Sequence, residues 1–491
     1  MIGRIAIGLI VTAPACNVKA QNSRAPLAVA PSAPRPLAVG PRAPISLAEA
    51  VFIGLRDNRT VKSAYIARVS EKFDLFVAQT RFRPTALLTA SDQATWQGGG
   101  GSSSSINPSV SWLAPTGAQF QFGWSRLETR GSGQSTRSEL ASLTFSQPLL
   151  RGGGLAVNAA PIRIAELQER VNRLTLKSTV ANTVTSIVTA YRTLLQAQAQ
   201  LVIAQQSLDR SNVQLETNQA LIDAGRMAAA EIIQTKADIA DQQVALLQAE
   251  QQLDSAQLAL LALLAMDLHT NIVAADPIKA EHLSVDVDQA IAIALDNRPD
   301  YLSQRLAVEQ ARQNLIVARN ARLWNLSVVG DVQHQTQHGS ASVAVNSTTG
   351  GGPSTTGAIG LQLSIPLGDY TLQQGEVQAT TTLRTAELQL EDLHEQVEAQ
   401  VRDAVQGVEL SWRQVEAARR ARDLAAETLA MEQEKLKAGR ASNFEVLSFE
   451  ANLRTADSQA LSASIGYLNA LTGLDQQLGA TLDTWKIDLN D

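Results

Sequence analysis

The chain has 491 residues, of which 45% are hydrophobic, 18% are charged and only 4% are aromatic. This composition excludes a wholly disordered chain and indicates a core of Ala, Leu, Val and Ile, which favours long, closely packed helices. The 47 acidic residues outnumber the 41 basic ones, and no run of Lys or Arg occurs, which argues against nucleic-acid binding. The single cysteine, Cys16, excludes a disulfide framework and a multi-cysteine metal site.

The first residues have the features of an export signal. One basic residue precedes a short apolar stretch at 5–11, and a small residue, Ala20, ends the segment. We therefore predict that residues 1–20 form a signal peptide that is cleaved after Ala20. A second kind of processing competes, because Ala13-Pro14-Ala15-Cys16 resembles a weak bacterial lipobox. In that case Cys16 is lipidated and becomes the first residue of the mature protein.

The next segment, 21–45, is rich in Pro and Ala. Because proline lacks the backbone N–H that a helix needs, we expect this segment to run as an extended arm. No apolar run in the sequence reaches the roughly 18 residues of a membrane-spanning helix. The longest is 258–266. If the chain crosses a membrane, it does so by β-strands.

The rest of the sequence contains the same plan twice. The segment 47–51 is echoed by 287–291, and each opens a helical pattern that leads into strands, a very long helix, a turn and another helix. We therefore predict a first repeat at 46–268, a second repeat at 269–475 and a C-terminal tail at 476–491.

The predicted strands alternate between apolar residues and Ser, Thr or Gln. The clearest examples are 118–125, 141–146, 326–333 and 359–365. This alternation is what a strand needs when it separates lipid from a wet lumen, although a soluble β-sandwich gives the same period.

Three features favour a sheet in a membrane. The segments 98–105 and 347–357 are rich in Gly, Ser and Thr, and we interpret them as solvated loops between strands. Trp96, Trp112 and Trp124 lie at or near the predicted strand ends, where an aromatic girdle would lie. The export signal precedes these strands.

The two long helices are predicted at 156–224 and 371–438, and each would be about 100 Å long. The second has apolar or small residues at alternating spacings of three and four, from Leu383 through Gln400 to Leu429, which predicts a coiled-coil seam. Ala also recurs beside this seam, so each helix can have neighbours on two sides, as in a tube of helices.

The doubled order of elements resembles the TolC-like outer-membrane efflux proteins over about 47–474. The same resemblance is seen in two shorter features. They are the segment that leads into the first long helix, Gln147-Pro148-Leu149-Leu150-Arg151-Gly152, and the paired Ala-Gly-Arg turns at 224–226 and 438–440. It implies a mixed α and β fold, in which a trimeric outer-membrane β-barrel is continuous with a long periplasmic α-helical coiled-coil barrel. One departure is a hairpin-like stretch at 109–125, between the two expected strands of the first half. The number of strands per protomer therefore stays open.

The resemblance also implies the function. A homotrimer in outer-membrane lipid would form the passive exit duct of a tripartite efflux or type I secretion system, coupled through a periplasmic adaptor to an inner-membrane pump. It would be neither an enzyme nor a nucleic-acid binder and would need no cofactor or metal, while the cargo, the pump class and the resting state stay open. The alternative is a trimeric coiled-coil surface or structural protein. We disfavour it because a stalk has no returning long helix, whereas both long helices here turn back.

Residues at the periplasmic mouth can be assigned only through the resemblance. Glu445 matches the first carboxylate of the pair that rings this mouth, Ser448 takes the second position, and Glu231 has the same offset in the first repeat. Three copies of Glu445 in a narrow bore would attract cations. The alternative is that both glutamates only favour the positive end of a helix dipole. The tyrosine and arginine that latch the mouth in the family fall at Leu436 and Ala441, which puts that latch in doubt.

The turns after the two long helices are the predicted docking tips for the adaptor. They contain Gly225 with Arg226 and Gly439 with Arg440. With the strands in the outer membrane, these turns would be the far ends of the periplasmic helices. The alternative is structural, because glycine suits a left-handed residue after a helix and arginine complements the negative helix end.

Overall fold

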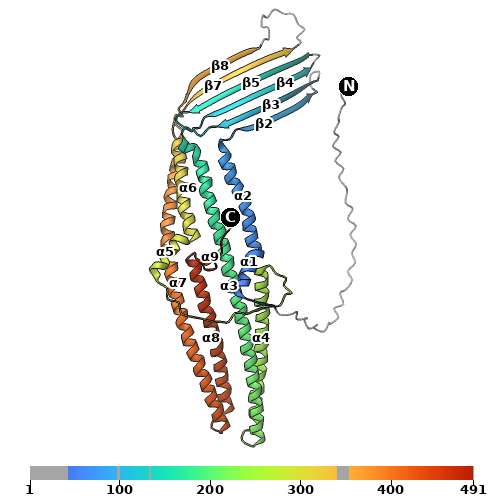
Figure 1. Ribbon diagram of the computed structural model, residues 1–491, viewed down its shortest axis with the longest axis vertical. Coiled ribbons are helices and arrows are strands. Elements are labelled where there is room, and N and C mark those ends of the chain that lie inside the picture. The colour runs from blue at the N-terminus through green and yellow to red at the C-terminus, as the bar shows by residue number, and fades with distance from the viewer. Residues whose placement is uncertain (1–42, 97–99, 132–133, 340–352, 490–491) are drawn as a thin grey trace, which may run out of the picture. The chain divides into compact units, whose positions relative to one another are not determined.

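The computed structural model describes residues 43–96, 100–131, 134–339 and 353–489 (Figure 1). The chain divides into Met1–Pro41 and Arg42–Asp491, and the description below concerns the second unit. The predicted signal peptide, the possible lipidation site Cys16 and nearly all of the arm at 21–45 lie outside the described residues. The last three residues of that arm form a short strand, β1 (Ala43–Ile45), which pairs in parallel with β6 (Ile272–Ala274).

The predicted plan occurs twice along the chain. The first half contains α1 (Leu47–Asp57), α2 (Arg59–Gln79), η1 (Thr80–Phe82), β2 (Thr85–Thr95), β3 (Gly101–Leu113), β4 (Gln119–Gly131), β5 (Gln134–Pro148), α3 (Leu155–Asp223), η2 (Ala229–Glu231) and α4 (Ile232–Leu264). The second half contains α5 (Val287–Asn297), α6 (Pro299–Ala321), β7 (Asn325–Gly339), β8 (Ser354–Ser364), α7 (Thr371–Lys437), α8 (Asn443–Gln477) and a final short helix, α9 (Thr481–Thr484). Helix α8 therefore continues two residues past the end at 475 that we expected for the second repeat.

The two halves begin with the same element but use different caps. The Ser46 hydroxyl accepts a hydrogen bond from the Glu49 backbone N–H, and the Glu49 carboxylate accepts one from the Ser46 N–H, which closes a capping box at α1. At α5 the Asp286 carboxylate accepts from the backbone N–H groups of Asp288 and Gln289. Either arrangement satisfies backbone donors that a helix start leaves free.

The long helices match the prediction closely. Helix α3 has 69 residues and α7 has 67. None of the helices in the described part of the chain has an apolar stretch sufficient to cross a membrane. One detail of the predicted seam is wrong: Gln400 is exposed, and its neighbour Val401 is fully buried instead. The reason is that α7 packs against α5 as well as α8 at this level, so its buried face turns by one residue.

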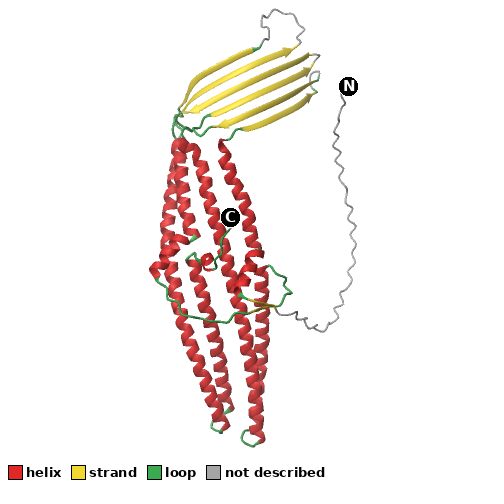
Figure 2. Cartoon of the chain, in the orientation of Figure 1, coloured by secondary structure: helices red, strands yellow, loops and turns green. Residues whose placement is uncertain are grey.

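The six long strands form one antiparallel sheet in the order β2-β3-β4-β5-β7-β8, at one end of the helices (Figures 1 and 2). The hairpin-like stretch of the first half is a true hairpin of β3 and β4. Its turn is closed by a hydrogen bond of 2.7 Å from the Ala114 N–H to the Ala118 carbonyl. The first half thus contributes four strands and the second half contributes two.

The two segments interpreted as loops are partly strand. Residues 101–105 begin β3 and residues 354–357 begin β8, so the loop prediction is wrong for these parts. Both segments consist of small polar residues, which form strands here because neighbouring strands satisfy them, as in the Ser91–Ser105 hydroxyl contact of 2.8 Å. Trp124 lies in the middle of β4, opposite Ala141, and not at a strand end.

The predicted alternation of the strands is confirmed by the register. One face carries an exposed apolar row formed by Val110, Phe122, Leu143 and Val332. The parallel row on the opposite face consists of Ser111, Gln121, Thr144 and Asp331. In the half next to the helices the sheet therefore has one apolar and one polar face. Farther along the strands, the apolar face carries the ion pairs Arg126–Glu139 and Glu128–Arg137. Neither face is covered by another layer of the described chain (Figure 2).

The buried apolar residues form separate clusters along the helices. One cluster lies around α1, α3 and α4 and includes Ile187 and Leu260. Another lies around α5, α7 and α8 and includes Val397 and Tyr467. A small cluster near the α7–α8 turn is built from Leu429, Leu436, Val446 and Leu453. The clusters hold α3 to α4 and α7 to α8. These two helix pairs meet one another mostly through polar residues, except near the tips, where Leu221 of α3 and Met227 pack on the small cluster.

Candidate functional site

The turns at the ends of α3 and α7 have the same backbone geometry. Gly225 and Gly439 have φ angles of +70° and +71°, in the left-handed region that suits glycine. The Gly225 N–H donates to the Ile222 carbonyl and the Arg226 N–H donates to the Leu221 carbonyl, both at 2.8 Å. The corresponding bonds at the second turn join Gly439 to Leu436 and Arg440 to Lys435, at 2.9 and 2.8 Å. Both turns are therefore complete Schellman motifs, and the glycines have a structural role in each.

The two arginines of these turns differ. Arg226 Nη2 donates to the Lys437 carbonyl oxygen at 3.2 Å, so this side chain caps α7 from the neighbouring turn. Arg440 is exposed, and its side chain forms no hydrogen bond or ion pair with any residue that the structure describes. The two tips have the same backbone geometry, but their arginine side chains make different contacts. A docking role for either stays a prediction.

Glu445 is the third residue of α8 and closes a capping box with Ser442. Its carboxylate accepts from the Ser442 N–H at 2.8 Å, and its own N–H donates to the Ser442 hydroxyl at 3.2 Å. The Ser442 N–H, then its hydroxyl, and then the charge of Lys435 lower the pKa of Glu445 below its usual range, so the exposed carboxylate stays ionised at neutral pH. Glu445 thus has the structural role at the start of α8 that was the alternative to a role at the mouth. It does not exclude a role at the mouth.

The other two candidate mouth residues lie in different settings. Glu231 ends η2 and precedes α4, and its side chain makes no capping hydrogen bond. Ser448 is exposed one turn after Glu445. Glu231 and Glu445 therefore do not play matching structural parts, despite their equal offsets from the two glycines.

Apolar packing occupies the positions of the family's polar latch. Leu436 is buried against Leu429, Val446 and Leu453, and Ala441 packs on the same cluster. These contacts join α7 to α8 but cannot supply the polar link that the family residues make.

A buried amide cluster, formed by Gln214, Asn218, Thr235 and Asn443, joins α8 to α3 and α4 close to the tips. The Asn443 side-chain oxygen accepts from Asn218 Nδ2 at 2.7 Å and from Gln214 Nε2 at 3.3 Å. Asn443 Nδ2 donates to the Thr235 hydroxyl at 3.1 Å. Asn218, Thr235 and Asn443 are completely buried. The sequence analysis missed this cluster, although isolated Asn residues in Ala- and Leu-rich coiled-coil helices are a signal for specific polar pairing.

A buried charged group follows one to two turns farther from the tips. Glu450 of α8 is 7% exposed, and burial, followed by repulsion from Asp238, raises its pKa to about 7, while Arg210 and Arg454 oppose the shift. Glu450 Oε1 and the Arg210 Nε and Nη2 atoms are buried without a hydrogen-bond partner among the described residues. Asp238 itself accepts from the Ser211 hydroxyl at 2.6 Å. The contact between α8 and α3–α4 is therefore polar and incompletely satisfied at this level.

The polar character continues along α3 and α8 to the other end of α8. The pairs along this line are Gln200–Ser458 at 3.2 Å, Gln196–Ser462 at 3.3 Å, Arg192–Thr472 at 2.7 Å and Asn182–Gln476 at 3.0 Å. We call this line of pairs, together with the amide cluster, the polar seam. Hydrogen bonds of this kind are exchanged for bonds to water at modest net cost, so the seam can separate more easily than an apolar core.

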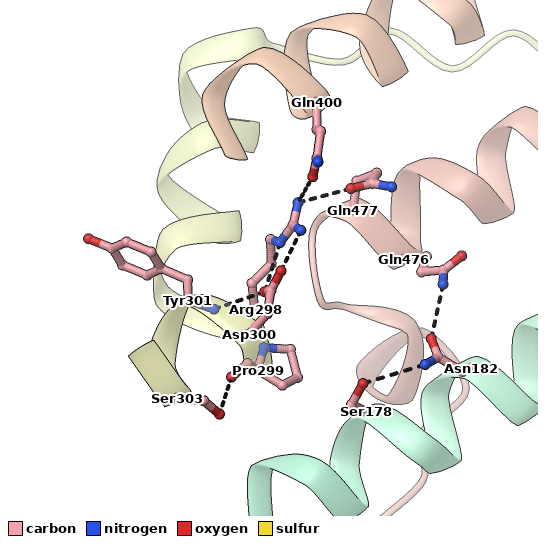
Figure 3. Close-up of polar contacts among 10 residues, drawn as sticks. All are labelled: Ser178, Asn182, Arg298, Pro299, Asp300, Tyr301, Ser303, Gln400, Gln476 and Gln477. Atoms are coloured by element: carbon pink, nitrogen blue, oxygen red, sulfur yellow. Dashed lines mark hydrogen bonds and ion pairs between the residues drawn. The ribbon is translucent and has the colours of Figure 1, made fainter. Parts of the chain in front are cut away.

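The upper end of the seam is joined to α6 and α7 by Arg298, the residue before α6 (Figure 3). Its guanidinium donates to Gln400 of α7 at 2.8 Å and to Gln477 of α8 at 2.9 Å, and it pairs with Asp300 at 2.6 Å. One side chain thereby fixes three helices where α8 ends. The other end of α8 is held to α3 and α4 by the hydrogen bonds of Asn443 and by Leu221 and Met227, which pack on the small apolar cluster near the α7–α8 turn.

Comparisons with known proteins agree with this architecture. A family model described as outer membrane efflux protein matches residues 102–266 and 290–480, more than half of the chain. The chain is 26% identical over 344 residues to the outer membrane efflux protein BepC of Brucella suis biovar 1 (strain 1330), covering 66% of this chain and 71% of BepC.

Solved structures share the fold at low sequence identity. The CmeC outer membrane channel of Campylobacter jejuni has a TM-score of 0.67 and 15% identity, over 89% of this chain and 86% of CmeC. The open-state MtrE outer membrane channel of Neisseria gonorrhoeae has a TM-score of 0.66 and 17% identity, over 89% of each chain. The outer membrane protein VceC of Vibrio cholerae has a TM-score of 0.65 and 17% identity, over 88% of this chain and 96% of VceC.

The fold is thus that of TolC-like outer-membrane channels, with the sheet at the outer membrane and the helices in the periplasm. The family model, the curated relative and the doubled helix–strand plan agree, and the chain belongs to the outer membrane efflux protein family.

Proposed function

We propose that three copies of this chain assemble into a passive exit duct, coupled through a periplasmic adaptor to an inner-membrane pump. The observation that carries the proposal is the open sheet. All residues of the edge strands β2 and β8 are exposed, and each edge has a row of backbone groups without a partner strand among the described residues. Unpaired backbone groups are not tolerated in lipid, so the edges must be paired by other copies.

The helices support the coupling to a pump. Helix α3 is about 100 Å long, and both helix pairs end in turns at the end opposite the sheet (Figure 1). With the sheet in the outer membrane, these turns extend toward the inner membrane. There a periplasmic adaptor can contact them. The alternative function, a surface stalk, would not require long helices that turn back on themselves.

The duct is passive in this proposal. The family is one of outer-membrane channels rather than enzymes. Export through the duct then takes its energy from the pump, and cargo selection lies mostly there.

The assembly can be tested by light scattering of the purified protein in detergent. We expect a mass of three copies. A monodisperse, fully folded monomer would contradict the proposal. In cells that lack other exit channels, the chain should restore export only when adaptor and pump are present.

The docking assignment is tested separately at the tips. Arg440→Glu reverses a charge that has no partner among the described residues, so it should abolish adaptor crosslinking and export without changing trimer yield. Arg226→Glu also removes the bond to the Lys437 carbonyl, and it is therefore compared with Arg226→Gln, which loses the same cap without reversing the charge. If the double variant Arg226→Glu/Arg440→Glu exports at the wild-type rate, the turns are structural caps and the docking assignment is wrong.

A further inference from the structure

We propose that the membrane part of the duct is a closed wall of eighteen strands, six from each copy, in which β2 of one copy pairs with β8 of the next. Its lumen is a wide pore with almost no fixed charge, suited to bulky polar cargo of either charge. The proposal rests on the trimeric duct proposed above. It goes beyond that duct by assigning the contact between copies, the strand number and the bore.

The two edge strands fit one another as neighbours. Strands β2 and β8 each have 11 residues. Strand β2 leaves the helices after η1, whereas β8 returns toward them before α7 (Figure 1). Because each copy contributes an even number of alternating strands, β8 of one copy runs antiparallel to β2 of the next, as every other pair in the sheet does.

The width of the six-stranded sheet, at an ordinary strand tilt, agrees with the width of the helix layer. At the sheet end the helices pack in the order α2, α3, α6, α7. Four helices about 9 Å apart span about 36 Å. Six strands about 4.8 Å apart, tilted by about 40°, span about 38 Å along the circumference, whereas four such strands would span only about 25 Å. The hairpin of β3 and β4 thus brings the sheet to the width of the helices.

The hairpin is also packed into the junction between sheet and helices. The Gly154 N–H, at the start of α3, donates to the Thr116 carbonyl in the hairpin turn at 3.0 Å, and the Thr116 hydroxyl bonds to Gln147 of β5 at 3.1 Å. Gly117 has a φ of +93°, and a Cβ there would lie 2.3 Å from the Gly152 carbonyl oxygen. This close approach requires glycine and ties the turn to the same junction that starts α3.

The hairpin further continues the apolar face of the sheet. Trp112 of β3, Phe120 of β4 and Phe145 of β5 form one row, with ring centroids 5.0 and 4.9 Å apart. If β2 paired directly with β5 and the hairpin left the wall, these rings would be separated and exposed to water. Their burial in lipid is favourable instead.

The opposite face is the one that lines the lumen. Its rows contain Ser, Thr, Gln and Asn with a few apolar residues, and among the described strand residues on this face only Asp331 is charged. Eighteen strands give a circumference of about 113 Å and a backbone diameter of about 36 Å, against about 24 Å for twelve. A lumen of this size and composition holds an aqueous channel without a charge filter.

The test is electron cryomicroscopy of the full chain in lipid nanodiscs. We expect a trimer with eighteen strands and a backbone diameter near 36 Å. A trimer with twelve strands would overturn this inference and leave the proposed duct standing. If no trimer forms, the proposed duct and this inference both fail.

Engineered disulfides in the intact trimer give a second measurement. Ala90→Cys combined with Ile106→Cys should crosslink, since these residues are register partners on β2 and β3. The control combines Ala90→Cys with Glu139→Cys on β5, the residue in the same row three strands away, and this pair should stay reduced. A disulfide in the control pair, with none in the first, would place β2 beside β5 and refute the six-stranded wall.

Discussion

The polar seam makes a quantitative prediction at Asn443. Replacing Asn443 with Ala removes hydrogen bonds to Asn218, Gln214 and Thr235, whose lengths are 2.7, 3.3 and 3.1 Å. It also removes a long contact of 3.5 Å to the Glu231 carbonyl oxygen, which is too weak to count as a fourth full bond. Because Asn443 lies at the first turn of α8, the change acts where α8 is held to α3 and α4 near the tips. We expect the tips of α7–α8 to separate more often from α3–α4.

The magnitude follows from the bonds that are lost. A typical hydrogen bond contributes about 1 kcal/mol net, so three of them contribute about 3 kcal/mol. Asn218 keeps its bonds to Thr235 and Gln214, at 2.8 and 2.9 Å, so no further orphaned group adds to this value. A difference of about 3 kcal/mol raises the population of separated tips on the order of 100-fold.

The assay is hydrogen exchange of the assembled protein, followed in the peptides that contain the two tips. Asn443→Ala should speed exchange there by about two orders of magnitude and leave the sheet and the upper ends of the helices unchanged. Ser448→Ala is the matched control, because Ser448 is exposed on the same helix. Unchanged exchange at the tips in Asn443→Ala would show that the amide cluster does not hold them together.

Three further predictions follow from other residues. The pKa of Glu450 is raised from the usual 4.5 to about 7, so the stability that its neutral form contributes is complete below about pH 4.5 and is lost as the pH rises through about 7. The protection factors of α8, which correct for the intrinsic rise of exchange with pH, should therefore fall between pH 6 and 8, and in Glu450→Gln they should stay constant; a variant whose protection still falls would assign the effect elsewhere. In planar bilayers the pore should prefer cations, and Glu445→Gln, which can keep the capping box without the charge, should weaken this preference more than Glu395→Ala on α7. Equal reversal potentials for these two variants would mean that Glu445 does not line the mouth. Intact mass should show cleavage after Ala20, and a diacylglyceryl-modified chain that begins at Cys16 would reverse this prediction.

Local patterns in the sequence determined the long helices, the turns and the strand faces. The spacing of small and apolar residues predicted α3 and α7 to within a residue at each end, because a helical seam repeats over many turns. Gly225 and Gly439 marked the two reversals, because a left-handed residue after a helix favours glycine whatever surrounds it. The doubled order of elements was equally visible, since it needs only comparison of the chain with itself.

Contacts between distant segments decided the rest. Residues 101–105 have a composition typical of a loop, and they are strand because β2 and β4 pair with them on both sides. Asn443 meets Asn218 although 225 positions separate them, and no periodicity within either helix encodes that meeting. Likewise, Arg226 and Arg440 occupy identical turns, yet only Arg226 reaches a carbonyl of the neighbouring helix. Backbone preference and hydrophobic period act over a few residues, whereas strand pairing and buried polar contacts depend on which segments the fold brings together.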